Sequence, residues 1–151
     1  MIPVESESST KNGMKVVYVA KENIFQYLKE RKEEGFDTLL MISGVDYRDH
    51  LEVMYHLLSS SSGSRLIVKT KTNDEVDSVT SLWKGADWHE RETWDLVGIK
   101  FKNHPNLKRI LLAEGWNGHP LRKDYPMDKK QYVNLGDDGE DIVSYEKTEG
   151  Y

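Results

Sequence analysis

Apolar residues recur at helical spacing early in the chain. Between residues 21 and 34, Ile24, Tyr27 and Leu28 fall on one face of a helix. Gly35 follows, and glycine readily takes the left-handed backbone conformation that often ends a helix. The spacing predicts a helix over 21–34.

Four other apolar runs are typical of strands. The segment KVVYVA (15–20) is short and β-branched, and DTLLMISGVD (37–46) has the continuous apolar character of a buried strand. HLEVMYHLL (50–58) alternates apolar and other residues, and RLIVKTKT (65–72) does the same after a serine-rich turn. The second and third runs are joined by a short polar turn, so they predict a hairpin.

The last of these runs carries two lysines on one side. Leu66, Val68 and Thr70 share one face of the predicted strand, and Lys69 and Lys71 point the other way. Charged side chains on a strand protect a sheet edge from pairing with another polypeptide. We therefore expect this strand to lie at or near an edge.

Two helices are predicted next. Thr72 and Glu75 have the S/T-x-x-E spacing of a capping box. The spacing i, i+3, i+4 and i+7 then predicts a helix with one face made of Val76, Val79, Thr80 and Trp83.

The second of these helices is shorter. Asp87 and Glu90, three residues later, repeat the capping pattern after Gly85, and Gly98 provides a natural end. The pattern therefore predicts a helix that ends near Gly98.

The order of elements predicts an α+β fold. We expect a two-layer sandwich of a small, mainly antiparallel sheet with helices, followed by a long irregular extension. The predicted divisions are a flexible N-terminus (1–14), the α+β sandwich (15–98), a Pro/Gly-rich basic docking extension (99–126) and an acidic tail (127–151). Within the extension, only LKRILLAEGW (107–116) has the character of a helix or an extended segment.

Composition limits the classes of function. The protein has 151 residues, of which 37% are apolar and 31% charged, enough for one domain with a modest core. It has no cysteine, which excludes disulfides, thiolate-bound iron-sulfur clusters and a cysteine nucleophile on this chain. No apolar run approaches the ~20 residues of a membrane span, and the N-terminus does not resemble a signal peptide. We expect a cytoplasmic location.

Charge is distributed unevenly along the sequence. The net charge is −5, yet residues 99–126 carry six basic and two acidic side chains and are flanked by acidic segments. A free nucleic-acid-binding protein is more often basic throughout, so we expect no nucleic-acid partner. Within the basic block, GHPLRKDYP (118–126) has a proline near each end, which restricts the backbone and favours a stiff loop.

Two groups of residues have the chemistry of a functional site, but the sequence gives each of them little further support. His89 and Glu92 share a helical face but Glu90 does not, and no other histidines lie at metal-ligand spacing, so we expect no metal. His119 and Asp124 have the chemistry of an acid-base pair. The sequence supplies neither a nucleophile nor a nucleotide-binding loop beside them, and an independent enzyme is the less favoured interpretation.

The four tryptophans all lie between residues 83 and 116. Trp83 is predicted to fill the core, because it closes the apolar stripe of a predicted helix. Trp88, Trp94 and Trp116 fit that role less well, and aromatic residues together with arginine are enriched at protein interfaces. These three residues favour a docking surface.

The segment ERETWDLVGIKFKNHPNLKRILLAEGWNGHPLRKDYP (90–126) resembles the signature region of the 30 kDa-type subunit of respiratory complex I, the NADH:quinone oxidoreductase. ERE with Asp95, GI-x-F, HP, RIL, W-x-G and PLRKDYP stand in the order of that family. The upstream plan of elements is also similar, so the resemblance covers residues 16–126.

The resemblance implies a domain without prosthetic groups at the cytoplasmic face of the membrane. Such a subunit packs on the large quinone-site subunit, or its hydrogenase-like counterpart, and near iron-sulfur subunits, with no membrane span of its own. The loop 118–126 then becomes a preorganised docking strap, with architecture and partner contact as its role. We expect the partner-docking residues to be Glu90, Arg91, Glu92, Asp95, His104, Pro105, Arg109, Trp116, His119, Arg122, Lys123, Asp124, Tyr125 and Pro126.

The sequence leaves open which machine of this superfamily the protein serves. Trp94 replaces a smaller aromatic residue, and Leu96-Val97 stands where a Met-Phe or similar pair is common. A ferredoxin-fed membrane-bound hydrogenase or sulfur reductase is the alternative, and a binding module of an unrelated cytoplasmic complex is the third class. The electron donor, the electron acceptor and the pumped ion belong to other subunits.

Overall fold

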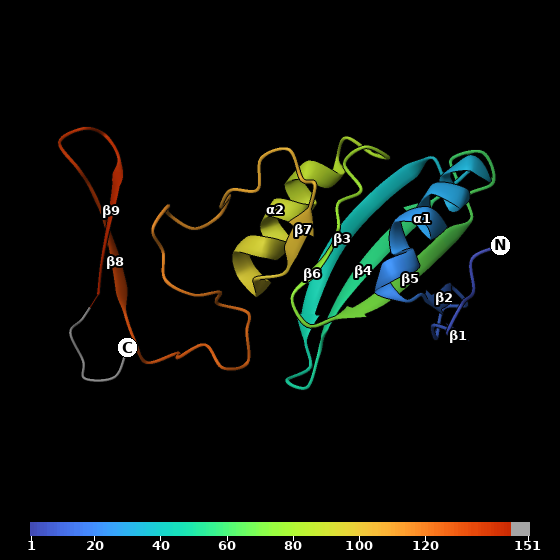
Figure 1. Ribbon diagram of the computed structural model, residues 1–151, viewed down its shortest axis with the longest axis horizontal. Helices are drawn as coiled ribbons and strands as arrows, with labels where there is room; N and C mark the ends of the chain where they lie inside the picture. Colours follow the sequence, from blue (N-terminus) through green and yellow to red (C-terminus); the bar gives the residue numbers. More distant parts are fainter. Residues whose placement is uncertain (146–151) are drawn as a thin grey trace.

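The computed structural model describes residues 1–145, which form a five-stranded sheet covered by helices on one face and continued by an extension (Figure 1). The strand order is β1-β2-β5-β4-β3, in which β2 and β5 are parallel and the other neighbours antiparallel. The strands of this sheet are β1 (Ser6–Ser9), β2 (Lys15–Tyr18), β3 (Thr38–Asp46), β4 (Leu51–Leu58) and β5 (Arg65–Thr72).

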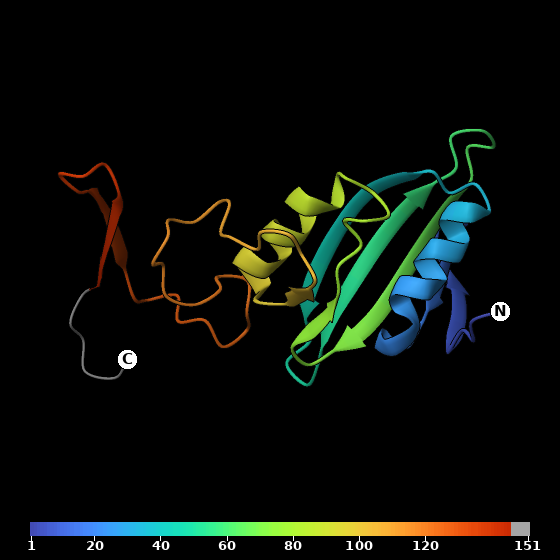
Figure 2. The same ribbon diagram turned by 45° about the horizontal axis from the view of Figure 1, so that its top comes forward.

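Two α-helices lie on the same face of this sheet (Figure 2). A short 3-10 helix, η1 (Lys21–Asn23), leads into α1 (Ile24–Glu33), whose residues Ile24, Tyr27 and Leu28 are buried as the spacing predicts. The second helix, α2 (Ala86–Val97), packs on β3.

The approach of α2 to β3 requires a glycine at position 44. A Cβ atom on Gly44 would lie 2.8 Å from the Thr93 side chain of α2. The helix can therefore pack this closely only where the strand has no side chain.

The α+β sandwich predicted from the sequence is confirmed. β4 contributes Val53, Tyr55 and Leu57 to the core, and all three are completely buried. They pack with α1, with β5 and with Val17 of β2 in one continuous apolar cluster. Alternation along the strands and helical spacing in α1 explain this part of the fold.

The helix predicted over 72–83 is wrong. Residues 75–77 instead form β6 (Glu75–Asp77), which runs parallel to β7 (Lys100–Lys102). The hydroxyl of Thr72 accepts a hydrogen bond from the amide of Asp74 and donates one to the carbonyl of Glu75. The threonine therefore stabilises a turn between β5 and β6 and does not cap a helix.

A buried carboxylate explains why the backbone does not become helical at Val79. Oε1 of Glu90 accepts the Val79 amide at 2.7 Å, and Oε2 accepts the Ser78 hydroxyl at 2.7 Å. Val76, Val79 and Trp83 are nonetheless buried, with exposed fractions of 3%, 0% and 7%. The spacing therefore predicted the burial correctly and the backbone conformation incorrectly.

The edge position expected for the strand 65–72 is also wrong. β5 lies between β2 and β4, so Lys69 and Lys71 do not protect an edge. α2 agrees better with its prediction, because Gly98 ends it with φ 81° in the left-handed region. Its N-cap is Gly85, however, and Asp87 lies inside the first turn.

Strands also lie in segments where the sequence predicted none. β1 lies within the first fourteen residues, and β8 (Gln131–Leu135) pairs with β9 (Asp141–Tyr145) as a hairpin beyond the extension. The stretch 107–116 is neither helix nor strand. The hairpin projects at the end of the molecule opposite α1 (Figure 1). The last six residues of the predicted acidic tail, 146–151, lie outside the described residues.

Candidate functional site

Asp95, a completely buried residue of α2, fixes the middle of the extension. Its Oδ2 atom accepts hydrogen bonds from three consecutive backbone amides, those of residues 110–112, at 2.8 to 3.0 Å. Its Oδ1 atom accepts one from the guanidinium of Arg109 at 2.7 Å. Burial opposes ionisation of this carboxyl group, but the Leu112 amide, Arg109 and the other two amides outweigh it and hold the pKa of Asp95 below its ordinary value.

Arg109 continues this connection toward the strap. Its Nη2 atom donates to the carbonyls of Trp116 and Gly118, at 2.8 and 2.9 Å. The guanidinium also lies over the ring of Trp94, 5.6 Å from its centre. One side chain therefore joins α2 to three points of an irregular loop, which is what a planar fork of donors does well.

Arg91 holds the same loop from the neighbouring turn of α2. Its Nε and Nη2 atoms donate to the carbonyls of Lys108 and Arg109, at 3.1 and 3.0 Å. Its guanidinium also lies 5.5 Å from the centre of the exposed Trp88 ring. The predicted docking arginines 91 and 109 thus both bind backbone carbonyls of their own chain.

Glu90 is the second completely buried acid of α2. Burial raises its pKa to about 7, the hydrogen bonds from Val79 and Ser78 act in the opposite direction, and the Asp87 carboxylate adds to the increase. The side chain of His104 is also completely buried, and its Nε2 lies 3.0 Å from Oδ1 of Asp87 and 3.9 Å from Oε2 of Glu90. These three side chains fasten α2 to the segments before and after it.

His119 anchors the strap where α2 ends. One ring nitrogen lies 2.9 Å from the carbonyl of Asp95, and the ring packs edge-on against Trp94. A Cβ atom on Gly98 would lie 2.6 Å from the His119 ring. Gly98 therefore ends the helix and also provides the space that the strap occupies.

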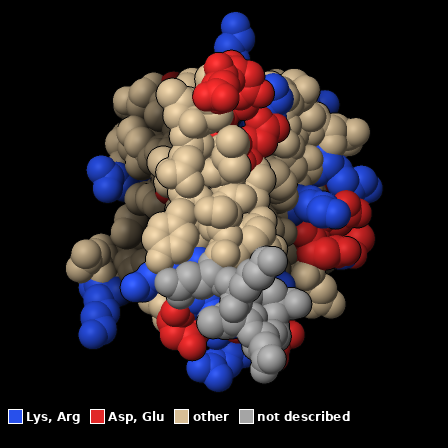
Figure 3. Space-filling view, turned by 90° about the vertical axis from the view of Figure 1, so that its left-hand side faces the viewer, with Lys and Arg blue, Asp and Glu red and all other residues tan. Residues whose placement is uncertain are grey.

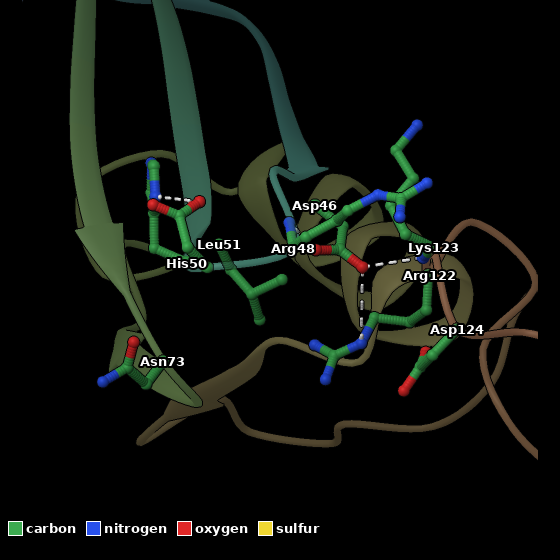
Figure 4. A pocket seen from close by; sticks show the side chains of 9 residues that line it. Asp46, Arg48, His50, Leu51, Asn73, Arg122, Lys123 and Asp124 are labelled. Atoms are coloured by element: carbon green, nitrogen blue, oxygen red, sulfur yellow. Dashed lines mark hydrogen bonds and ion pairs between the residues drawn. The ribbon is translucent and has the colours of Figure 1, made fainter.

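Asp46, at the end of β3, also holds the strap, through Arg122 and Lys123 (Figure 4). Its carboxylate accepts the amides of Lys123 and Arg48, each at 2.7 Å, and Nε of Arg122 lies 4.0 Å away. The two amides, with Arg122, hold the pKa of Asp46 below its ordinary value despite burial. The Leu121 amide also donates to the carbonyl of Leu96.

The end of the strap connects to the hairpin. The hydroxyl of Tyr125 accepts hydrogen bonds from Nε1 of Trp116 at 3.2 Å and from Nε2 of Gln131 at 3.1 Å. A Cβ atom on Gly118 would lie 3.1 Å from the Tyr125 ring. The strap thus folds back on itself at Gly118, with φ 84°.

The structure divides the predicted docking residues into two groups. Most of them contact their own chain: Glu90, Arg91, Asp95, His104, Arg109, Trp116, His119, Arg122 and Tyr125. Glu92, Pro105 and Asp124 are exposed and Pro126 is half-buried, and Lys123 is exposed although its backbone amide donates to Asp46. Arg122 binds within its own chain: its Nε atom lies 4.0 Å from Asp46 of β3, and its Nη1 atom donates to the carbonyl of Val97, the last residue of α2, at 3.4 Å.

The cavities beside the strap are open and polar. One, of about 390 Å³, is bounded by Asp46, Arg48, His50, Asn73 and Arg122. His119 and Asp124 both line a second, of about 530 Å³. Within residues 1–145, no three His, Asp or Glu side chains are grouped to hold a metal ion.

Sequence reasoning missed the exposed apolar residues of this region. They lie in short, separate segments, Leu111 within the apolar run 110–113 and Ile142 beside Val143, so no single helical or strand spacing joins them. Uncharged side chains occupy the middle of this end of the molecule and charged ones lie toward its rim (Figure 3). The most exposed apolar residues beyond α2 are Leu111 (62%), Leu121 (57%), Met127 (89%), Leu135 (76%) and Ile142 (55%).

Two solved structures share this fold. A polypeptide described as Nqo5 of the trypsin-resistant fragment (1-134) is 30% identical, with a TM-score of 0.64 over 68% of this chain and 89% of its own. A polypeptide of the membrane-bound sulfane sulfur reductase, an archaeal respiratory membrane complex, is 24% identical, with a TM-score of 0.71 over 81% of this chain and 77% of its own. At that identity the second likeness shows the fold alone.

Sequence comparisons give the family. An NADH-quinone oxidoreductase subunit of Citrifermentans bemidjiense is 46% identical over 76% of this chain and 76% of its own length. The subunit of the same name from Roseiflexus sp. (strain RS-1) is 46% identical over 74% of this chain and 69% of its own. Within residues 1–145 no helix is long and apolar enough to cross a membrane. The family model for the respiratory-chain NADH dehydrogenase 30 Kd subunit matches residues 17–131, and the chain belongs to that family.

Proposed function

We propose that this protein is a non-catalytic structural subunit of a complex I-type NADH:quinone oxidoreductase. It packs on the large quinone-site subunit, near the iron-sulfur subunits, at the cytoplasmic face of the membrane. Electron transfer and ion translocation take place on the other subunits. The family and the two NADH-quinone oxidoreductase subunits that are 46% identical support this assignment.

One observation carries the docking role. Exposed apolar side chains stand on a backbone that Asp95, Arg109 and Asp46 already hold in shape. Because the loop is ordered by its own chain, binding does not have to offset the entropy of ordering it. Large exposed apolar surfaces mark interaction sites. The polar motif residues thus shape the extension, and the apolar residues between them make the contact with a partner.

The test is to purify the complex through a tag on this chain. A flavin-bearing NADH subunit, a quinone-site subunit and NADH:quinone activity are the expected companions. A nickel-containing large subunit would instead favour the membrane-bound hydrogenase alternative. Subunits of no redox complex at all would contradict the proposal and favour the unrelated binding module.

A docking variant sharpens this test. Leu121→Asp places a charge on the proposed contact surface, and we expect at least about a tenfold loss of the protein from the complex. Lys29→Glu is the control, since it adds an acid at an exposed position of α1, far from the extension (Figure 1). Equal retention of the two variants would contradict the docking role.

A further inference from the structure

The cavity between the strap and the turn that joins β3 to β4 contains an arginine with few partners in its own chain. A guanidinium carries five N–H donors. In the described part of the chain, the Arg122 side chain makes a single, long hydrogen bond, 3.4 Å from Nη1 to the carbonyl of Val97, and its Nε lies 4.0 Å from Asp46. Figure 4 shows this guanidinium pointing into the space between Asn73 and Asp124, within a cavity of about 390 Å³. Most of its donors are therefore available to a ligand.

The other two arginines that bind the extension differ from Arg122. Arg109 makes four hydrogen bonds of 2.7 to 3.2 Å, and Arg91 makes two of 3.0 and 3.1 Å. Their donors give the loop of their own chain its shape, whereas the one-third exposed side chain of Arg122 keeps its donors free. A planar fork of free donors is suited to a carboxylate, which it binds with two parallel hydrogen bonds.

Arg48 adds a second cation at an unusual backbone position. Its φ is 75°, in the left-handed region that favours glycine, and its amide is held by Asp46. The side chain is exposed and lines the same cavity, and its guanidinium has no hydrogen bond or ion pair with residues 1–145. The fold therefore gains no contact from an arginine side chain at a position where glycine suits the backbone better.

The charges that line the cavity leave a positive excess. Asp46 already accepts two backbone amides, and Asp49 lies 2.9 Å from Nδ1 of His50. Asp124 is the one lining acid that has no such partner among the described residues. The cations that line the cavity are Arg48, Arg122 and Lys123. An acidic ligand therefore complements this cavity better than a basic one.

Exposed apolar side chains flank the cations. Tyr47 is 48% exposed and stacks on His50, with ring centres 5.2 Å apart. Leu121, next to Arg122, is 57% exposed. Tyrosine and arginine are enriched among the residues that dominate binding at protein interfaces. Because Leu121 belongs to the proposed docking surface, the cavity continues that surface.

We infer that this cavity receives the carboxylate of an aspartate or glutamate from an acidic segment of the partner subunit. Arg122 binds that carboxylate with two parallel donors, and Arg48 and Lys123 attract the acidic residues beside it. Tyr47 and Leu121 pack on the apolar side chains of the same segment. This inference rests on the proposed function, because the partner is another subunit of the complex, and it adds the chemistry that the partner presents.

Photo-crosslinking in the assembled complex tests it. One variant carries p-benzoylphenylalanine in place of Tyr47 beside the cavity, and a second carries it in place of Met127 on the extension. A third, in place of Lys29 on α1, reports non-specific capture. The crosslinked peptides are sequenced, and the Tyr47 variant is expected to capture a segment of another subunit that contains aspartate or glutamate.

The outcomes separate the two claims. Capture at Met127 without capture at Tyr47 would overturn this inference and leave the proposed function standing, whereas no capture at either site would overturn both. Capture at Tyr47 of a lipid, of a second copy of this protein, or of a segment without acidic residues would overturn the inference.

Two substitutions test the cations separately from folding. Arg122→Gln should lower retention in the complex about tenfold, and Arg48→Gly about threefold, while Lys29→Gln, with the same change of charge, should have no effect. Glycine suits φ 75°, so melting of the full-length Arg48→Gly protein should be unchanged or slightly higher. Retention equal to the control in both variants, with normal melting, would contradict the site.

A double-mutant cycle tests the direct pair. Once the Tyr47 crosslink identifies the acid of the partner, that acid is replaced by its amide, alone and together with Arg122→Gln. Because the two groups are expected to bind each other, the second substitution should add little to the first. Losses of retention that add up in full would show that Arg122 and this acid do not pair.

Discussion

The sandwich and the extension are held together by different interactions. In the sandwich, Tyr55, Leu57 and their neighbours are buried because apolar surface is removed from water. In the extension, Asp95 and Arg109 bind backbone amides and carbonyls of a segment with little regular structure. Many small apolar contacts define the first region, and a few polar side chains, each with several partners, define the second.

This difference determines how each region tolerates substitution. Apolar packing is distributed, so a loss at one position is limited to that side chain and the cavity it leaves. In the extension, by contrast, one carboxylate accepts hydrogen bonds from three amides and a guanidinium, so the shape of a whole loop depends on one residue. We therefore expect the extension to be most sensitive to substitution of the buried acids of α2 and β3 that bind it.

Asp95→Ala should have the largest effect. It leaves the Arg109 guanidinium and the amides of 110–112 without their partner, which costs about 4–5 kcal/mol, the upper part of the range for breaking a buried ion pair. Thermal unfolding of the full-length protein measures this loss. Asp95→Asn keeps an acceptor oxygen and should lose less. A change below about 1 kcal/mol for the alanine variant would show that the extension does not depend on this residue.

Trp83→Ala should follow. The ring is 7% exposed and its Nε1 donates to the Asp37 carbonyl at 3.1 Å, so we expect a loss of about 3–4 kcal/mol. Trp116→Ala should cost about 1–2 kcal/mol, because the ring is half-buried and loses one hydrogen bond to Tyr125. Trp88→Ala serves as the control, because the Trp88 side chain is exposed. Melting that ranks Trp116 above Trp83 would reverse our division between core and extension.

Glu90 predicts a pH dependence of stability. Its carboxyl group has a pKa of about 7 in the folded protein and an ordinary value of 4.5, so the unfolded protein releases this proton first as the pH rises. The free energy of unfolding therefore falls between pH 4.5 and 7, by about 3 kcal/mol from this group, and is level above that range.

Glu90→Gln is the variant that isolates this contribution. The amide cannot ionise but can still accept from Val79. The difference in unfolding free energy between the two proteins should therefore change with pH only between about 4.5 and 7. A constant difference across this range would mean that Glu90 is ionised throughout.

The smallest effects on stability are expected in the strap. Arg122→Ala should cost less than about 1 kcal/mol, because the group is one-third exposed and 4.0 Å from Asp46. Asp124→Ala should leave melting unchanged, since the residue is exposed, while lowering retention in the complex. Asp46→Ala should cost more than either, because it removes the acceptor of two amides. If Asp124→Ala neither assembles poorly nor melts early, it has no role in docking.

The sequence predicted the elements whose structure follows from periodicity. β3, β4, β5 and α1 depend on repeated apolar positions, and each such position adds to the same pattern. The segment 72–83 shows the limit of that reasoning. Its spacing fits a helix, but the carboxylate of Glu90 binds the Val79 amide, and nothing local to that segment indicates this.

The extension was predicted to dock on a partner from its motif residues, and its shape could not be predicted in the same way. Asp95 and Arg109 are fourteen residues apart, and their contact depends on where the loop returns to α2. Charged residues in an irregular segment are usually solvated or bind a partner, so a guanidinium bound to its own backbone has no distinctive sequence pattern. Only Gly98 and Gly118, which allow the close approach of His119 and Tyr125, signal the folded strap locally.

Hydrogen exchange of the full-length protein, measured before any partner is added, tests the central claim most directly. If the extension is shaped by its own residues, the amides of 110–112 and Lys123 are protected in the free protein, and Asp95→Asn and Asp46→Asn each weaken protection at their own set of amides. Exchange of these amides at the rate of an unstructured peptide in the free protein, with protection gained only in the assembled complex, would show that the partner imposes the shape and would contradict the account.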